Sequence, residues 1–398
     1  MALTRRGFVQ AAAVGAAGTL TSGWIAARGR ENALWALVEP AVRASERVVM
    51  LASNENPLGP GEHVLNAVRA AFGEGGRAPG RYAGNARDLI DAIAKKQGVK
   101  PENVVLGCGS TQILRSATHL FTAKDRPLVG AIPTYEECAG YAEMMGHPVR
   151  PVALDAAFRI DLDKLADASK GAGLVFYCNP NNPTATYVGA RATRDFFAKV
   201  ARDSPETTIL VDEAYFDYVT DSDHDTHIPV AVENRRVIIA RTFSKAYGMA
   251  GLRMGYAIGH KDTIKKMNDW DGGSGTGSLN VLAIHAGLAA IAQDASFTAD
   301  ERARNKAVRD FTMTWFADRG MTPADSQANF MFVNIGRPAK PFRDACRAKG
   351  IVVARDFPPF EQTHCRISFG TMAEMKKAVA VFGDVLRQTS TSARGMAP

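Results

Sequence analysis

The sequence predicts an α/β protein in which a mostly parallel, doubly wound sheet forms a large domain, followed by a smaller α+β domain. Short apolar runs alternate with helical patterns between about residues 104 and 260, which is the order of elements in such a sheet. Polar residues follow several runs at the point where each strand would end, and that edge of a parallel sheet is where ligands bind. Three further short strands alternate with helices beyond about residue 330, which indicates the second domain.

Length and composition are those of a globular protein with two domains. The chain has 398 residues, against roughly 100–200 for a typical domain. Its net charge of +7 is scattered, without a basic run containing aromatic residues, which argues against nucleic acid as a partner. The 5 cysteines show no CxxC pair and no zinc spacing. We therefore expect buried thiols and no metal site, with one disulfide as an alternative if the protein is exported.

The first residues contain an arginine pair. Arg5 and Arg6 are followed by no charge until Arg28. The intervening residues are mostly Ala and Gly, so their hydrophobicity is too low for a typical membrane helix. This pattern resembles a twin-arginine export signal, which predicts a periplasmic protein carried in folded form by the twin-arginine translocase. An uncleaved membrane anchor and a plain disordered tail are the alternatives.

The chain divides into successive segments by composition and pattern. Residues 1–28 form the export signal, and residues 29–75 are expected to pack on the small domain. Residues 76–275 form the large domain and residues 276–388 the small one. The Ser/Thr-rich residues 389–398 are expected to form a disordered tail.

Two polar stretches are shaped by proline. Residues 51–60 (LASNENPLGP) hold too many Pro, Gly and polar residues for a regular helix. Residues 178–184 (CNPNNPT) follow an apolar strand at 174–177, and their two prolines end it. A turn specified so strongly at a strand end is either a ligand-binding edge or simply a forced turn.

A strand at 104–106 leads into residues 107–111 (GCGST) and then into a helix that ends near Phe121. A Gly-rich turn at the start of a helix offers unpaired backbone N–H groups and the positive end of the helix dipole, which suit an anion such as phosphate. A plain strand-to-helix turn with Ser110 as the N-cap explains the same residues without a ligand.

Two neighbouring strands end in an acid and an amine. The run 209–211 leads into Asp212, and the run 237–240 leads into residues 241–245 (RTFSK). Their ends meet at one edge of a parallel sheet, so an amine, a carboxylate, hydroxyls and a phenol converge there. Such a set could hold pyridoxal phosphate, with Lys245 as its Schiff-base partner and Asp212 beside its ring nitrogen. A lysine at this position is otherwise an ordinary solvated charge.

Two further segments look like binding motifs but lack the necessary framework. Residues 221–227 (DSDHDTH) contain metal-binding residue types, although no helix or strand pattern fixes their geometry, so we expect a solvated loop. Residues 271–277 (DGGSGTG) lack the Lys-Ser/Thr ending and the preceding strand of a phosphate loop. We expect a mobile segment between the two domains.

Six stretches, in this order, resemble the fold-type I pyridoxal-phosphate aminotransferases, most closely the histidinol-phosphate aminotransferase branch. The resemblance covers about residues 48–388. The stretches are 54–60 (NENPLGP), 181–184 (NNPT), 212–215 (DEAY), 242–248 (TFSKAYG), 251–256 (GLRMGY) and 365–370 (CRISFG). The resemblance implies transamination between an amino donor and a keto acid acceptor, in a homodimer whose subunits share their active sites.

The resemblance also implies cofactor-binding roles. Lys245 matches the lysine that forms the Schiff base, and Asp212 matches the acid on the ring nitrogen. Asn182 and Tyr215 match the donors to the ring hydroxyl, and Tyr135 matches the aromatic residue stacked on the ring. The residues that match the phosphate cradle are Gly109, Ser110, Thr111, Thr242, Ser244 and Arg253.

Substrate and partner contacts follow from the same resemblance. Arg366 matches the arginine that holds the substrate carboxylate through two parallel hydrogen bonds. Arg355 resembles a second anion-binding arginine of the histidinol-phosphate branch, and Asn56 is assigned to substrate binding. Tyr82 resembles the tyrosine that reaches the phosphate bound by the partner subunit.

The chain departs from the family pattern in ways that put its substrate in doubt. Ala185 replaces the glycine of the usual Asn-Pro-Thr-Gly turn, and residues 110–112 (STQ) replace a Ser/Asn followed by an acid. Export is also unusual for histidine biosynthesis. A decarboxylase or lyase on the same scaffold and a pyridoxal-phosphate-binding protein without turnover are the alternatives. Arg366 argues against decarboxylation, because a carboxylate held by an arginine lies near the ring plane. The presence of Lys245, Asp212 and Arg366 together also argues against a protein that binds pyridoxal phosphate without turnover.

Overall fold

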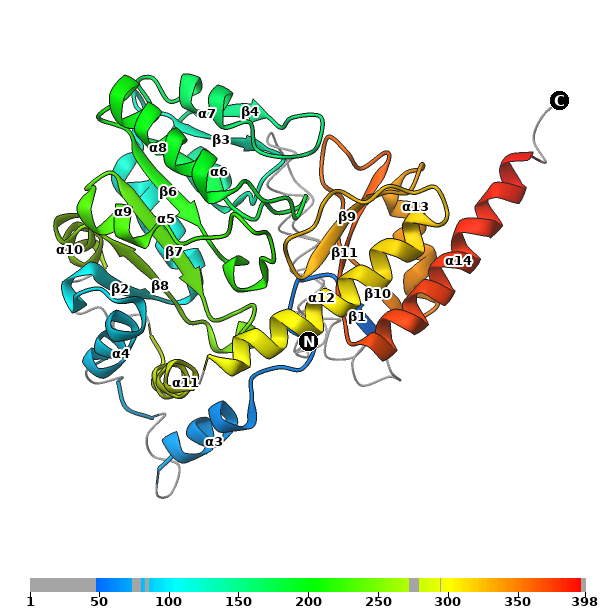
Figure 1. Ribbon diagram of the computed structural model, residues 1–398, viewed down its shortest axis with the longest axis horizontal. Helices are drawn as coiled ribbons and strands as arrows, with labels where there is room; N and C mark the ends of the chain where they lie inside the picture. Colours follow the sequence, from blue (N-terminus) through cyan, green and yellow to red (C-terminus); the bar gives the residue numbers. More distant parts are fainter. Residues whose placement is uncertain (1–47, 74–79, 83–85, 272–278, 294, 395–398) are drawn as a thin grey trace, which may run out of the picture. The chain divides into compact units, whose positions relative to one another are not determined.

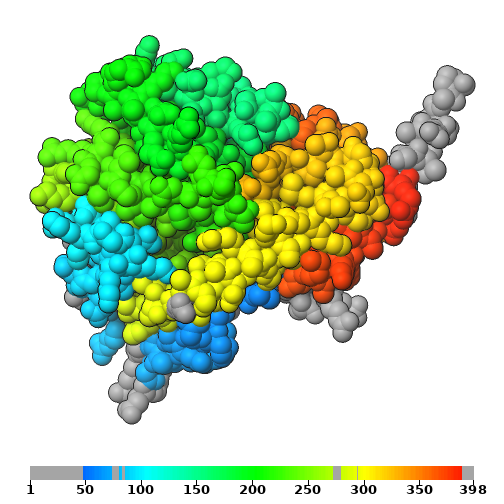
Figure 2. Space-filling view, viewed as in Figure 1, coloured from blue at the N-terminus to red at the C-terminus, as the bar shows by residue number. Residues whose placement is uncertain are grey.

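The structure is a computed structural model that describes residues 48–73, 80–82, 86–271, 279–293 and 295–394 (Figure 1). The predicted export signal at 1–28 lies outside these residues, as does nearly all of the Gly-rich segment 271–277. The chain divides into two units, Met1–Val48 and Val49–Pro398. The second unit contains a large lobe and a small lobe, whose atoms pack directly against each other in Figure 2.

A sheet of seven strands forms the large lobe, in the order β2-β8-β7-β6-β5-β3-β4. Its pairs are parallel except those of β8, which is antiparallel to both β2 and β7. The predicted mostly parallel sheet is therefore confirmed. The strands are β2 (Val104–Gly107), β3 (Leu128–Ile132), β4 (Val149–Ala153), β5 (Leu174–Cys178), β6 (Thr208–Asp212), β7 (Val237–Thr242) and β8 (Gly255–Gly259).

Helices lie on both faces of this sheet (Figure 1). Successive strand residues point to opposite faces, so Val175 and Tyr177 of β5 join one hydrophobic core while Leu174 and Phe176 join the other. The longer helices of this lobe are α3 (Glu62–Ala71), α4 (Arg87–Gln97), α5 (Gly109–Phe121), α6 (Glu137–Met144), α7 (Leu162–Ala168), α8 (Ala190–Asp203), α9 (Ile228–Glu233), α10 (Lys261–Trp270) and α11 (Val281–Ala292). Three short 3-10 helices are η3 (Pro101–Asn103), η4 (Phe216–Tyr218) and η5 (Ala250–Leu252).

The small lobe contains two two-stranded sheets. β1 (Val49–Leu51) pairs in parallel with β10 (Ile351–Val353), and β9 (Phe330–Asn334) pairs in antiparallel fashion with β11 (His364–Ser368). Helices α12 (Ser296–Ala317), α13 (Ala339–Ala348) and α14 (Met372–Arg394) share one hydrophobic core with these strands. Because β1 belongs to this core, the chain enters the small lobe before it builds the large one.

The structure differs from the predicted division in three places. Residues 29–75 were expected to pack on the small domain, but helix α3 within them packs into the core of the large lobe. Helix α11 packs into the core of the large lobe, against α3 and α4, although residues 276–388 were assigned to the small domain. Most α11 residues are apolar, so its sequence does not indicate which core it joins. Helix α14 extends to Arg394, past residue 389 where a disordered tail was expected, since Ser and Thr only weakly oppose a helix that is already formed. No single described helix is long and apolar enough to cross a membrane; α11 and α12 satisfy such a test only together and are bent by 86° at their break.

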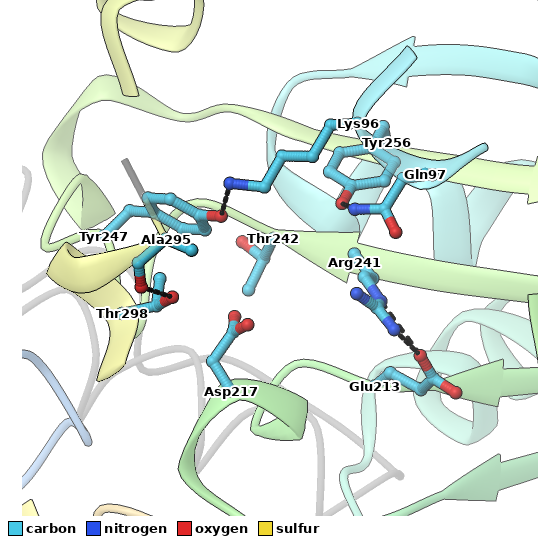
Figure 3. Close-up of a pocket in the computed structure, with 10 residues that line it drawn as sticks. All are labelled: Lys96, Gln97, Glu213, Asp217, Arg241, Thr242, Tyr247, Tyr256, Ala295 and Thr298. Atoms are coloured by element: carbon cyan, nitrogen blue, oxygen red, sulfur yellow. Dashed lines mark hydrogen bonds and ion pairs between the residues drawn. The ribbon is translucent and has the colours of Figure 1, made fainter. Parts of the chain in front are cut away.

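A buried ion pair joins the carboxyl ends of two neighbouring strands of the large lobe, because Arg241 lies in β7 and Glu213 directly follows β6 (Figure 3). The Arg241 guanidinium donates through Nη2 and Nε to Glu213 Oε2, at 2.7 and 2.9 Å, and lies 3.8 Å from the ring centre of Phe216. Burial raises the pKa of the Glu213 carboxyl, although Arg241 acts in the opposite direction. The pair forms part of the wall of a cavity of ≈ 180 Å³. The residues that line it are Lys96, Gln97, Glu213, Asp217, Arg241, Thr242, Tyr247, Tyr256, Ala295 and Thr298.

We expect Arg241→Met to lower the free energy of unfolding by about 3–5 kcal/mol, because it leaves the Glu213 carboxylate buried without its cation. Denaturant titration measures the loss. Arg319→Met is the matched control, because this exposed arginine also stacks on an aromatic ring, that of Trp315. Arg241→Met with Glu213→Leu should recover most of the stability. A loss no larger than that of Arg319→Met would contradict the assigned role of the ion pair.

Candidate active site

The carboxyl ends of neighbouring strands bring the predicted acid and amine to one place. Asp212 ends β6 and stands in register with Cys178 of β5 and Ala240 of β7. Lys245 follows β7 by three residues. The electrostatic influence of Lys245 on Asp212 shows that the two side chains share one environment. The convergence predicted for these strand ends is therefore present in the fold.

The Asp212 carboxylate is deeply buried, with 2% of its surface exposed. Burial raises the pKa of Asp212 to about 7, although the Ala214 N–H and the Lys245 amine both act to lower it. The Ala214 N–H donates to Asp212 Oδ1 at 3.1 Å. A buried carboxylate at a ligand-binding edge is strongly stabilised in its charged form by a nearby cation. The protonated nitrogen of a pyridine ring fits this requirement.

The Lys245 amine is placed to act as a base. Its Nζ donates to the Ser53 carbonyl at 3.1 Å and lies 5.7 Å from the ring centre of Tyr215. Burial and the nearby Arg366 guanidinium lower the pKa of Lys245 to about 8. At pH 7 roughly a tenth of the amine is therefore unprotonated, which is the form that a nucleophile or general base requires.

Arg366, on β11, provides an anion-binding group close enough to Lys245 to act on it electrostatically. Its side chain is 8% exposed, and its Nη1 donates to Asn182 Oδ1 at 2.6 Å while Nη2 donates to the Ala52 carbonyl. Among the described residues, no carboxylate pairs with Arg366, and its buried Nε has no hydrogen-bond acceptor. Burial lowers the pKa of Arg366 to about 10. A buried cation that meets only neutral oxygens is suited to a carboxylate or phosphate of the substrate.

Tyr215 is positioned by residues from the N-terminal stretch and the small lobe. Its hydroxyl accepts a hydrogen bond from Asn54 Nδ2 at 3.1 Å, and Asn54 Oδ1 accepts one from Ser368 Oγ at 2.8 Å. Asn54 adopts φ 56°, a left-handed conformation that Asn tolerates better than most residues. Asn329 Nδ2 also donates to the Asn54 carbonyl, at 2.9 Å. Asn54 therefore fixes the tyrosine in place.

The predicted phosphate cradle assembles at the N-terminus of α5. Arg253 reaches Ser244 Oγ at 3.4 Å through Nη1 and Thr111 Oγ1 at 3.5 Å through Nη2, and Thr242 Oγ1 donates to Ser244 Oγ at 3.0 Å. Gly109 has φ +71°, and a Cβ there would lie 2.3 Å from Arg253 Nη2. A side chain at this position would displace the Arg253 guanidinium, and the positive φ also favours glycine. Hydroxyls, an arginine and helix N–H groups together fit a phosphate.

Four other residues predicted to belong to the site differ in their burial and in their contacts. Burial raises the pKa of the Tyr135 phenol, and the Asp212 carboxylate acts in the same direction. Asn56 Nδ2 donates to the Ala246 carbonyl at 3.0 Å, so this residue holds the loop that carries Lys245. Tyr82 is 102% exposed and does not enter the site of its own chain. Arg355 forms an ion pair with Glu136.

Two departures from the family pattern have local explanations. Ala185 adopts φ 63°, the conformation that the usual glycine would supply, and its N–H donates to the Asn181 carbonyl at 2.7 Å. Gln112 accepts a hydrogen bond at Oε1 from the Cys108 N–H at 2.7 Å. Both loops are therefore closed by hydrogen bonds although their residues differ from those of the family pattern.

Sequence reasoning assigned no role to Asn54 or Glu136. Asn54 lies inside the stretch that carried the resemblance, and its place in that stretch was the only available signal. Glu136 directly follows Tyr135, and its relation to Arg355 depends on a contact across 219 positions that no local pattern reveals. The carbonyls of Ala52 and Ser53 were also missed, because backbone acceptors carry no sequence signature.

Comparison with known proteins agrees with this geometry. Residues 46–382 match the family described as aminotransferase class I and II. The chain is 34% identical over 341 residues to histidinol-phosphate aminotransferase of Moorella thermoacetica, covering 85% of this chain and 86% of the relative. It is 31% identical over 349 residues to that of Halalkalibacterium halodurans, covering 87% and 91%. A solved histidinol-phosphate aminotransferase of Sinorhizobium meliloti, in complex with pyridoxal-5'-phosphate, superposes with a TM-score of 0.78 at 27% identity, covering 88% and 94%.

In the cofactor-free protein, we expect an amine-selective acylating reagent to label Lys245 with a midpoint near pH 8, because its pKa lies at about 8. Arg366→Gln should move the midpoint upward, since removing a nearby cation stabilises the protonated amine. Peptide mass spectrometry across a pH series measures the labelling. Lys164 is an internal control that should label only at higher pH, because hydrogen bonding to Asp161 raises its pKa. An unchanged midpoint in Arg366→Gln would show that the two groups are not coupled.

Proposed function

This chain belongs to the class I and II aminotransferase family, and we propose that it moves an amino group from a phosphorylated amino compound, such as histidinol phosphate, to a keto acid, which becomes the amino acid. Pyridoxal-phosphate-dependent transamination is its reaction class. The observation that carries the proposed substrate is the buried Arg366 guanidinium, which meets only neutral oxygens among the described residues and has no carboxylate partner there. A phosphate or carboxylate of the substrate would supply the missing negative charge.

Asp212, Lys245 and Tyr215 are the residues that perform the chemistry around the cofactor. When bound, pyridoxal phosphate supplies a cationic ring that accepts the electron pair left at the substrate Cα when its proton is removed. Asp212 holds the proton on the ring nitrogen, since a buried carboxylate favours a cationic partner. Tyr215, fixed by Asn54, offers its hydroxyl to the oxygen on the ring.

Lys245 moves the proton at the substrate Cα. Its lowered pKa gives a neutral amine that can take this proton and return it. The contact of Asn56 with the Ala246 carbonyl steadies the loop that carries the lysine. Arg366 meanwhile fixes the anionic group of the substrate, and Asn182 orients the guanidinium at 2.6 Å. Together they hold the reacting carbon within reach of one amine, which is an entropic contribution to catalysis.

The curated relatives are named histidinol-phosphate aminotransferases, which supports a phosphorylated amino compound as one substrate. Histidinol phosphate carries its charge on a phosphate rather than on a carboxylate. Arg366 can bind either group, because the guanidinium offers the same two parallel donors to both. The proposed enzyme therefore uses a single arginine for the phosphorylated compound and for the amino acid.

We further propose a homodimer with shared active sites. Tyr82 supports it, because it resembles the tyrosine that reaches the phosphate bound by the partner subunit, and its side chain is 102% exposed and therefore accessible to a second chain. The exposed Leu58 and Phe72 belong to the same N-terminal part of the large lobe. Size measurement in solution tests the proposed dimer.

Export by the twin-arginine route is likewise a proposal, supported by Arg5, Arg6 and the uncharged span that follows. The family match begins at residue 46, so this segment lies outside it. A route that carries folded proteins suits an enzyme that must acquire its cofactor first. Membrane anchoring through an uncleaved signal is the variant of this proposal.

The substrate assignment is tested by donor screening with keto acid detection. We expect Arg366→Gln to lower kcat/KM for histidinol phosphate by roughly 10- to 100-fold, from the loss of a charge-assisted hydrogen-bonded pair. Histidinol, which lacks the phosphate, should be affected far less. Arg387→Gln, at an exposed arginine paired with Asp384, is the control. Equal losses with histidinol and histidinol phosphate would overturn the assigned role of Arg366.

The export proposal predicts that Arg5→Lys with Arg6→Lys traps the protein in the cytoplasm, because the route recognises the arginine pair. Cell fractionation with an antibody to the enzyme measures the distribution. Lys100→Arg with Lys124→Arg, made outside the signal, is the matched control for basic-residue exchange. Export that continues unchanged in the double lysine variant would exclude the signal.

A further inference from the structure

A second arginine faces the active site, with a carboxylate already bound to it. Arg355 follows β10, and its Nη2 donates to Oε2 of Glu136, while its Nη1 donates to the Asp356 carbonyl at 2.9 Å. Glu136 directly follows Tyr135 and immediately precedes helix α6. The pair therefore joins the small lobe to the loop of the large lobe that carries the predicted ring-stacking tyrosine.

Arg355 and Arg366 lie against the same aromatic ring. Their guanidinium carbons are 4.5 and 4.7 Å from the ring centre of Phe357. Arg355 and Glu136 both act electrostatically on Arg366, with opposite signs. The two arginines differ in their partners: Asn182 and a backbone carbonyl hold Arg366, whereas a full negative charge neutralises Arg355.

We propose that Glu136 is a specificity-determining residue that competes with a second anionic group of the substrate for Arg355. This inference rests on the proposed function and narrows its substrate class. A substrate with one anionic group binds at Arg366 and leaves the Arg355–Glu136 pair in place. A dicarboxylic substrate has to displace the Glu136 carboxylate from Arg355, or else place its second carboxylate beside that of Glu136. Either outcome weakens the binding of dicarboxylic amino acids.

The exposure of the pair makes this competition effective. The side chains of Arg355 and Glu136 are 35% and 30% exposed, so both are partly desolvated yet still accessible to a solute. Partial desolvation strengthens attraction between the pair and repulsion of a second anion. A carboxylate that remains near Arg355 also weakens the attraction of that arginine for any other anion. Specificity thus arises from a repulsive group as well as an attractive one.

A merely structural role for the pair is the competing explanation. Because Arg355 and Glu136 come from different lobes, their ion pair could simply fasten the lobes together. Loss of such a fastening would affect all substrates alike. Competition instead changes the ratio between substrates that differ only in one charge.

Glutamate and glutamine are such a pair, since they share length and shape and differ in side-chain charge. We expect Glu136→Gln to raise the ratio of kcat/KM for glutamate to kcat/KM for glutamine by about tenfold or more. Glu137→Gln is the matched control, because this neighbouring carboxylate pairs with Arg115 instead. In the double variant Glu136→Gln with Arg355→Gln, the ratio of the two kcat/KM values should return to that of the wild-type enzyme. The increase depends on the Arg355 guanidinium that Glu136→Gln leaves without its carboxylate partner.

A binding measurement separates this inference from the proposed function. Calorimetric titration of the holoenzyme with glutarate and pentanoate, which differ by one carboxylate, requires no turnover. Glu136→Gln should lower the Kd of glutarate by about tenfold or more relative to that of pentanoate. An unchanged ratio of the two Kd values would overturn the inference. An equal change in kcat/KM for glutamate and glutamine in the kinetic test would overturn it as well. A wild-type enzyme that transaminates no donor would overturn the proposed function while leaving this titration decisive.

Discussion

The structure depends on the burial of a few charges at one edge of a sheet. Asp212 sits almost fully buried between β5 and β7, and burial raises its pKa to about 7. Lys245 and Arg366 experience the same poorly solvated environment with the opposite effect, so their pKa values fall. Water would remove these shifts; the Lys245 amine would then be protonated at neutral pH, and the attraction of the Arg366 guanidinium for an anion would be weaker. The apolar strands that exclude water are thus as much a part of the site as the charged groups.

Both lobes are needed to hold these charges in position. Asn182 of the large lobe orients Arg366 of the small lobe, and Asn54 links Tyr215 to Ser368. The N-terminal stretch runs between them and supplies backbone carbonyls to Arg366 and Lys245. A shift of one lobe against the other would therefore separate the anion-binding group from the base. Preorganisation here comes from hydrogen bonds that join segments far apart in the sequence.

The elements predicted from the sequence were those whose patterns are local. The apolar runs of β5, β6 and β7, and the Gly-rich start of α5, carry clear local signals. Strand β4 was missed, because this edge strand contains Arg150 and Pro151 and has only one buried residue. The placement of α11 could not be read, since its mostly apolar surface fits either core.

Residue roles were predictable only where a motif carried them. Lys245, Asp212 and Arg366 each stand in a recognisable stretch, and the fold brings all three together. Ala185 shows the limit of such motifs: it keeps the left-handed turn although glycine is usual there, at a cost of roughly 1–2 kcal/mol. Hydrogen bonds from its N–H to Asn181 and from Gln327 to its carbonyl hold the turn. Surrounding structure can thus replace a residue that the motif treats as required.

The two arginines that contact Phe357 have identical side chains but differ in how strongly they attract an anion. Each has the same charge and the same aromatic contact, so neither residue type nor stacking distinguishes them. The difference lies in the acceptor that each one meets. Neutral oxygens orient Arg366 and leave its charge uncompensated, whereas the Glu136 carboxylate cancels most of the charge of Arg355. Because attraction for an anion depends on net local charge, the position of a single carboxylate decides which arginine attracts the substrate. The selectivity of this cleft therefore depends on its acid as well as its bases.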